Sequence, residues 1–108
     1  MDEDVWVPPA CTLPTAERPL RLAEFDDLFA TALREQDRLS PTGLRWRFDP
    51  GAELVARDLT ARESECCSFF AFTLRRTADD LVVDVAVPAA QVEVLDALAQ
   101  RAADRMAR

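Results

Sequence analysis

The spacing of hydrophobic side chains switches between two periods along the chain, and this switching limits what the chain can fold into. From about Leu22 to about Arg38, apolar residues recur every three to four positions, which predicts a helix with one buried face. Leu44, Trp46 and Phe48 then alternate with arginines, as in a half-buried strand. Such a chain has to pack helices against a sheet.

The second half of the sequence shows the same switching. We expect a helix over about 52–67, then a strand over 69–74 and a second strand over 81–87. Residues 77–80 between these strands have the composition of a hairpin turn. A last helix is expected over about 89–107.

These elements predict an α+β fold, in which a small antiparallel or mixed sheet of three to four strands has helices on one face. A short first strand is expected at Cys11–Leu13, which gives the order (β)αβαββα, and a ferredoxin-like variant is one form of it. Apolar residues make up 49% of the 108 residues, enough to bury a core. We expect a single domain over 11–108, preceded by a flexible segment over 1–10.

The composition excludes several function classes. Histidine is absent, so neither a Ser-His-Asp nor a Cys-His catalytic site can form within one chain. The two glycines, Gly43 and Gly51, are too few for a glycine-rich phosphate loop. A formal net charge of −7 argues against a nucleic-acid partner. There is neither a long apolar run nor a basic start, so we expect no membrane segment, no secretory signal and a cytoplasmic location.

The strongest candidates for chemistry lie between Glu63 and Cys67. Glu63, Cys66 and Cys67 are spaced i, i+3 and i+4, so they are neighbours on one helix face. Glu63 continues the row of Val55 and Leu59, so its carboxylate should face or border the core, where it needs a partner. The cysteines are placed at the C-terminal end of the helix, whose negative dipole favours a bound cation over a reactive thiolate. This position favours ligation over covalent catalysis.

Two thiolates and a carboxylate suit a soft or borderline ion, with Hg, As, Cd, Pb and Zn as the candidates. Cys11 is the only other thiol in the chain. If its strand runs beside the end of the helix, three thiolates would favour mercury or a metalloid over zinc. We therefore predict a metal site made of Cys66, Cys67, Cys11 and Glu63, with no organic cofactor.

Other interpretations of these residues stay open. Free cysteines are often buried, so Cys66 and Cys67 could pack as small hydrophobes, and the protein would then be an interaction or effector module without metal. Glu65 is expected to face solvent, and Glu63 could pair with one of three arginines: Arg45, Arg47 or Arg62. A small thiol-dependent enzyme, such as a reductase or an organometal-cleaving enzyme, is a further alternative that needs a reactive cysteine.

The stretch Arg62–Leu74, followed by Leu81–Val83 and Pro88, resembles a small bacterial domain with an E-x-E/Q-C-C-x-F core. That domain occurs free-standing and as a tail on MerR-type metal-responsive regulators. The resemblance covers about residues 52–100, and Cys11–Thr15 looks like the N-terminal signature of the free-standing form. It implies a heavy-metal or metalloid context. Ser68 stands where proline is frequent in that family, which loosens the turn but leaves the thiols in place.

The residues and the resemblance together predict a protein that binds a soft metal or metalloid ion, in an accessory, buffering or sensing role rather than as an enzyme. The expected partners are the ion and either a second copy of the chain or a regulator protein. The chain has no helix-turn-helix of its own, so direct DNA binding is not expected.

Overall fold

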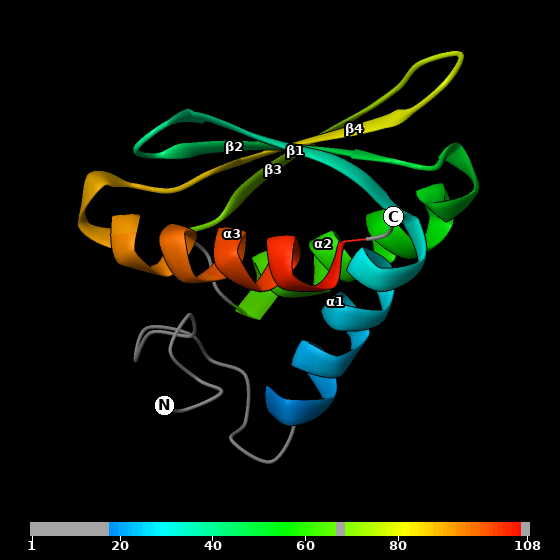
Figure 1. Cartoon of the computed structure of the whole chain (residues 1–108). Coiled ribbons are helices and arrows are strands. Elements are labelled where there is room, and N and C mark those ends of the chain that lie inside the picture. The colour runs from blue at the N-terminus through cyan, green and yellow to red at the C-terminus, as the bar shows by residue number, and fades with distance from the viewer. Residues whose placement is uncertain (1–17, 67–68, 107–108) are drawn as a thin grey trace.

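The computed structural model describes residues 18–66 and 69–106, with side chains from Ala23 onward and without that of Cys66. In chain order its helices and strands are α1 (Arg18–Ala32), β1 (Leu33–Ser40), β2 (Gly43–Phe48), α2 (Glu53–Cys66), β3 (Ala71–Arg76), β4 (Leu81–Ala86) and α3 (Val92–Arg105). Two short 3-10 helices, η3 (Pro50–Ala52) and η4 (Ala89–Gln91), lead into α2 and α3. The helices lie together on one face of a four-stranded sheet (Figure 1), which confirms the predicted α+β class.

The sheet consists of two hairpins that meet at its centre. Its strand order is β1-β2-β4-β3 and every neighbouring pair is antiparallel. In the turn between β3 and β4, the Thr77 N–H donates to the Asp80 carbonyl at 2.8 Å, as the predicted turn over 77–80 requires. The described elements follow the order αββαββα, so the predicted order (β)αβαββα lacks the strand β1. The strand predicted at Cys11–Leu13 and the segment 1–10 lie outside the described residues.

The first helix is shorter than its sequence predicts. The expected helix over 22–38 ends at Ala32, and β1 follows it and pairs with β2. The Trp46 indole N–H donates to Gln36 Oε1 at 2.7 Å, and Gln36 Nε2 donates to the Ala99 carbonyl at 3.0 Å. Pairing with β2 and these tertiary hydrogen bonds outweigh the helical propensity of the segment, so the prediction was wrong here.

The core lies between the sheet and the helices. On the inner face of the sheet, Leu44, Trp46 and Phe48 of β2 stand opposite Val85, Val83 and Leu81 of β4. The ring of Trp46 lies 5.1 Å from that of Phe29 in α1 and 5.9 Å from that of Phe48. Among the described residues, no helix is long and apolar enough to span a bilayer.

Helix α2 presents a slightly different face to the core than its periodicity predicts. Leu59 and Glu63 are buried, as expected, but Val55 is 58% exposed and Ala56 is buried in its place. Residues 55 and 56 precede Leu59 by four and three positions, so either could share its face. The prediction was therefore right for Leu59 and Glu63 and wrong for Val55.

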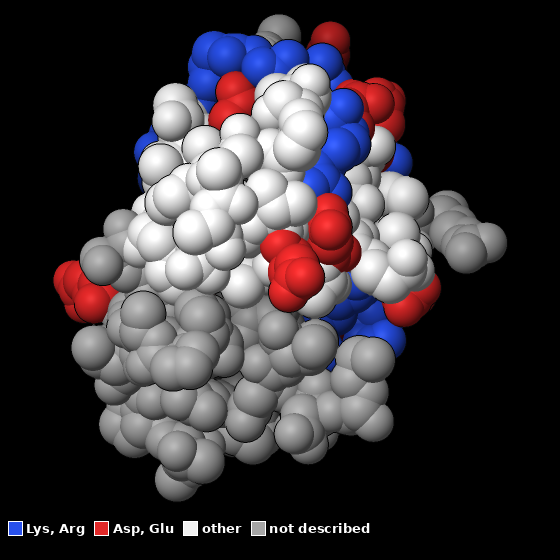
Figure 2. Space-filling model, turned by 90° about the vertical axis from the view of Figure 1, so that its left-hand side faces the viewer, with Lys and Arg blue, Asp and Glu red and all other residues white. Residues whose placement is uncertain are grey.

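One end of the molecule presents a surface with few charges. On the side that carries the β1–β2 turn and the start of α3, Figure 2 shows mainly uncharged side chains over the described residues. The exposed residues of these two connections include Leu39, Pro41, Pro88, Ala89 and Ala90.

Candidate functional site

The predicted site begins in the last turn of α2, which ends at Cys66. Glu63 lies one turn before this end and is only 1% exposed. Its carboxylate is not an isolated charge. Glu65 is exposed, as predicted. The last turn contains Glu63 and Glu65 and no basic residue, and it lies at the end of the helix where the dipole is negative.

Arg62, which directly precedes this turn, is held by two carboxylates. Its Nε donates to Asp58 Oδ2 at 3.1 Å and its Nη1 to Glu24 Oε1 at 3.1 Å, while Nη2 contacts the second oxygen of Glu24. The hydrogen bond to Glu24, and then that to Asp58, raises the pKa of the guanidinium above its ordinary value. Glu24 belongs to α1, so this group also joins α1 to α2. Its positive charge is already balanced, and it adds little to the potential at Cys66.

The other two arginines considered for Glu63 have carboxylate partners of their own. Arg45 makes two hydrogen bonds to Asp84, at 2.7 and 3.0 Å, and Arg47 lies 3.7 Å from Glu35. Their registers place these pairs on the sheet face opposite the buried row Leu44, Trp46 and Phe48. Both arginines are therefore engaged on the outer face of the sheet.

The four predicted ligands are described to different extents. The structure places Glu63 at the edge of the core and Cys66 at the end of α2, both where the sequence puts them. Cys67 and Cys11 lie outside the described residues, as does the side chain of Cys66. The convergence of the three thiols therefore stays a prediction. Within 18–66 and 69–106, no three cysteine, aspartate or glutamate side chains gather closely enough to hold a metal ion.

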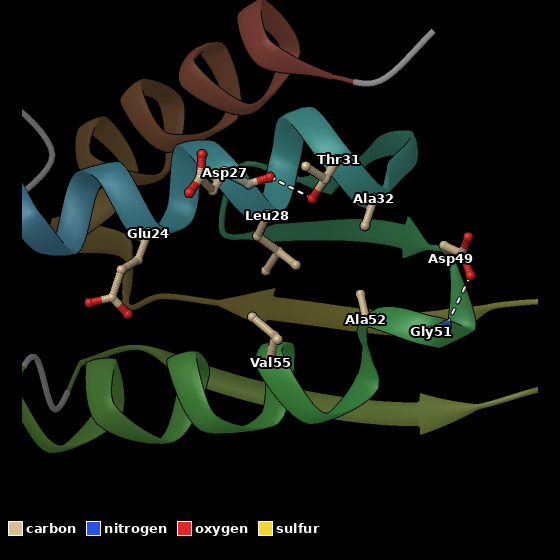
Figure 3. Close-up of a pocket in the computed structure, with 9 residues that line it drawn as sticks. All are labelled: Glu24, Asp27, Leu28, Thr31, Ala32, Asp49, Gly51, Ala52 and Val55. Carbon is tan, nitrogen blue, oxygen red and sulfur yellow. Dashed lines mark hydrogen bonds between the residues drawn. The ribbon is translucent and has the colours of Figure 1, made fainter.

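A pocket between α1 and the start of α2 was not foreseen from the sequence. Its volume is about 440 Å³. Leu28 and Ala32 of α1 face Ala52 and Val55 across it, and Figure 3 shows the side chains of Leu28 and Val55 pointing toward each other. The apolar periodicity of α2 assigns Val55 to the core, so the sequence does not predict this pocket. Three acidic residues, Glu24, Asp27 and Asp49, complete the charged part of the lining.

Comparisons of the chain with protein-family models, with curated proteins and with solved structures find no match. The resemblance to the E-x-E/Q-C-C-x-F domain therefore stays a prediction. What the chain can do has to be inferred from its own residues.

Proposed function

We propose that the protein binds a soft metal or metalloid ion through Cys66 and Cys67, with Cys11 as a third thiolate and Glu63 beside them. The observation that carries this proposal is the position of Cys66 as the last residue of α2, one turn after the buried Glu63. Adjacent thiolates prefer soft ions, so mercury(II) and arsenic(III) are the first candidates, followed by cadmium, lead and zinc. The role would be accessory, buffering or sensing.

The thiolates would supply most of the affinity, and the helix end would adjust it. A charge at a helix terminus is worth about 0.3–1 kcal/mol, whereas a complete thiolate-rich metal site supplies on the order of 10 kcal/mol. The negative last turn of α2 would therefore select for a cation without binding it alone. A second copy of the chain or a regulator protein could complete the coordination.

The same surroundings support binding over catalysis. A reactive thiolate is stabilised by nearby positive charge or by a helix N-terminus. Cys66 ends its helix instead, the last turn holds two acids, and Arg62 is engaged by Glu24 and Asp58. A thiol-dependent enzyme has less support from this arrangement than an ion-binding protein.

Titration of the fully reduced protein with mercury(II) or arsenite tests the proposal. We expect stoichiometric binding, followed by the near-ultraviolet absorption of the metal–thiolate bonds, and loss of tight binding when Cys66→Ser and Cys67→Ser are combined. Glu63→Gln should weaken binding by about 10–100-fold, as the loss of a group that supports metal ligands does. Glu65→Gln, an exposed acid two positions away, is the matched control and should leave the affinity unchanged.

Three results would contradict the proposal. A double cysteine variant that binds either ion as tightly as the parent protein would place the site elsewhere. Thiols that react with a thiol reagent only after denaturation would instead favour a module with core cysteines. Rapid alkylation well below the unperturbed thiol pKa of about 8.5 would favour the enzyme.

A further inference from the structure

We propose that the pocket between α1 and α2 binds a small organic cation, namely an ammonium group that carries a compact aliphatic or aromatic body. The volume of about 440 Å³ falls within the range of about 300–1,000 Å³ that is typical of small-molecule sites. Val55 and Cys66 are eleven positions apart on α2, roughly 16 Å along the helix axis. The pocket is thus separate from the proposed metal site, and the inference does not depend on it.

The pocket exists because small residues separate α1 from the start of α2. The Asp49 N–H donates to the Ala32 carbonyl at 2.9 Å, which holds the segment before η3 against the end of α1. Ala32 and Ala52 are too small to fill the space beyond this bond. Leu28, which is 4% exposed, forms the floor, and Val55, which is 58% exposed, forms the opposite wall. A bound apolar group would cover the exposed part of Val55, which supplies a hydrophobic contribution to binding.

Among the described side chains, the charged residues of the lining are all acidic. Glu24, Asp27 and Asp49 line the pocket, and no arginine from this part of the chain does. Glu24 is bound to Arg62, and Asp49 lies 3.5 Å from Arg34, while Asp27 has no ion-pair partner within the described part of the chain. The two arginines are shared with further carboxylates, those of Asp58 and Asp80. Around the pocket, carboxylates therefore outnumber guanidinium groups among the described side chains, which attract a cation.

An anion is the competing ligand, because the N-terminus of a helix offers backbone N–H groups. Here those groups already have acceptors. The Gly51 N–H donates to Asp49 Oδ1 at 2.9 Å, the Ala52 N–H to the Asp49 carbonyl at 3.0 Å, and the Glu53 N–H to the Pro50 carbonyl. An anion would find no open donor at η3 and would meet three carboxylates. The same pocket should therefore discriminate between ligands by the sign of their charge.

The test compares three ligands of matched shape on the reduced, metal-free protein: phenethylammonium, 2-phenylethanol and 3-phenylpropanoate. Amide resonances followed by NMR should shift on titration with phenethylammonium, mainly within 24–32 and 49–55. The alcohol should bind more weakly and the carboxylate more weakly still. Added salt should reduce the difference between the ligands, since it screens the carboxylates.

Matched variants locate the site. Val55→Phe places a large ring in the pocket and should weaken phenethylammonium binding at least tenfold, whereas Leu54→Phe, its exposed neighbour outside the lining, should not. Asp27→Asn should weaken binding by about two- to fivefold, as expected for one exposed carboxylate. Combined Cys66→Ser and Cys67→Ser should leave the affinity for phenethylammonium intact, which separates this inference from the metal site.

The wild-type series alone can overturn the inference. Equal affinity for the three ligands, tighter binding of the carboxylate, or shifts outside 24–32 and 49–55 would each contradict it. So would a folded Val55→Phe variant that binds phenethylammonium as tightly as Leu54→Phe. Circular dichroism of the two variants establishes that they are folded.

Discussion

Glu63 is 1% exposed and is the one charged residue of the described chain that is almost completely buried. A carboxylate in this position is stable only if polar or charged groups replace the water that it has lost. In the proposed function, the site formed with the cysteines gains from this carboxylate. The residue would then contribute both to stability and to ion affinity.

Replacement of Glu63 by alanine should destabilise the protein by about 1–3 kcal/mol, because the groups that interact with the buried carboxylate lose their partner. Glu65→Ala removes the same side chain from the same helical turn, but on the exposed side. Its effect should stay within about 0.5 kcal/mol. Urea unfolding of the reduced, metal-free proteins measures both values. Equal destabilisation by the two substitutions would show that the buried position of Glu63 adds nothing to its contribution to stability.

For single residues of α2, the sequence predicted correctly which way some side chains face. It was wrong about others for a geometric reason. The contrast between buried Glu63 and exposed Glu65 follows from their spacing to Leu59, and the structure confirms it. Val55 and Ala56 are both one turn from Leu59, so periodicity could not decide which of them faces the core. That choice depends on how α2 sits against its neighbours, which a local pattern does not contain. The pocket was missed for the same reason.

Helix α2 is anchored to the core by few large side chains. Leu59 is completely buried, whereas Leu54, on the same helix, is 84% exposed. Most of the apolar attachment of this helix therefore depends on Leu59, together with the smaller Ala56.

Leu59→Ala should cost about 2–5 kcal/mol, since it removes buried methyl groups and leaves a cavity. Leu54→Ala makes the same chemical change on the same helix and should alter stability by less than about 0.5 kcal/mol. Thermal unfolding followed by circular dichroism compares the two. A larger loss for Leu54→Ala than for Leu59→Ala would mean that α2 is turned differently about its axis.

At the level of elements, long segments with one clear hydrophobic period were predicted well. The segment that forms β1, residues 33–40, was not. The hairpin of β3 and β4 and the helix α2 lie close to their predicted bounds. Residues 33–38 were assigned to a helix because Leu33 and Gln36 continue the three- and four-residue spacing of the residues before them. Only Leu33 in this segment is buried, so no alternation of apolar residues marks the strand. Its extended form comes from its pairing with β2, which is non-local information.

The carboxylate of Asp26 links the first helix, α1, to the last helix, α3. Asp26 of α1 accepts hydrogen bonds from Arg101 of α3 at 2.7 and 2.8 Å, and Arg105 approaches it to 3.0 Å. Partial burial alone would raise the pKa of Asp26, but the hydrogen bonds from Arg101 and Arg105 outweigh it, so the pKa lies below its ordinary value. The ionised form is therefore favoured by folding.

This cluster makes part of the stability dependent on pH. Because the pKa of Asp26 is lower in the folded protein, its contribution is complete above the unfolded-state value of about 3.9 and is lost as the pH falls through the folded value. Asp26→Asn should lower the free energy of unfolding at pH 7. It should also make the decrease of this free energy below about pH 4 less steep. Asp27→Asn changes the adjacent, exposed carboxylate and should keep the full decline. Urea unfolding between pH 7 and pH 3 measures this, and identical profiles for Asp26→Asn and the parent would contradict it.

The α+β class, with helices on one face of a small sheet, could be predicted because it depends only on which segments are helices and which are strands. Most of these assignments were correct. The strand order could not. It is set by β2 pairing with β4 at the centre, as in Trp46 opposite Val83, and no local pattern specifies this pairing. Of the predicted site residues, Glu63 and Cys66 lie on α2 where the sequence puts them, while the approach of Cys67 and Cys11 stays a prediction.

The two hairpins and their central ladder also suggest an order of events during folding. Each hairpin joins neighbouring strands through a short connection and loses little chain entropy when it closes. The ladder between β2 and β4 has to close a much longer loop that contains α2, and contacts of this kind slow folding. We expect the joining of the two hairpins to be the late step that completes the core. Trp46 lies in that ladder, so the fluorescence of its indole would follow this step in real time.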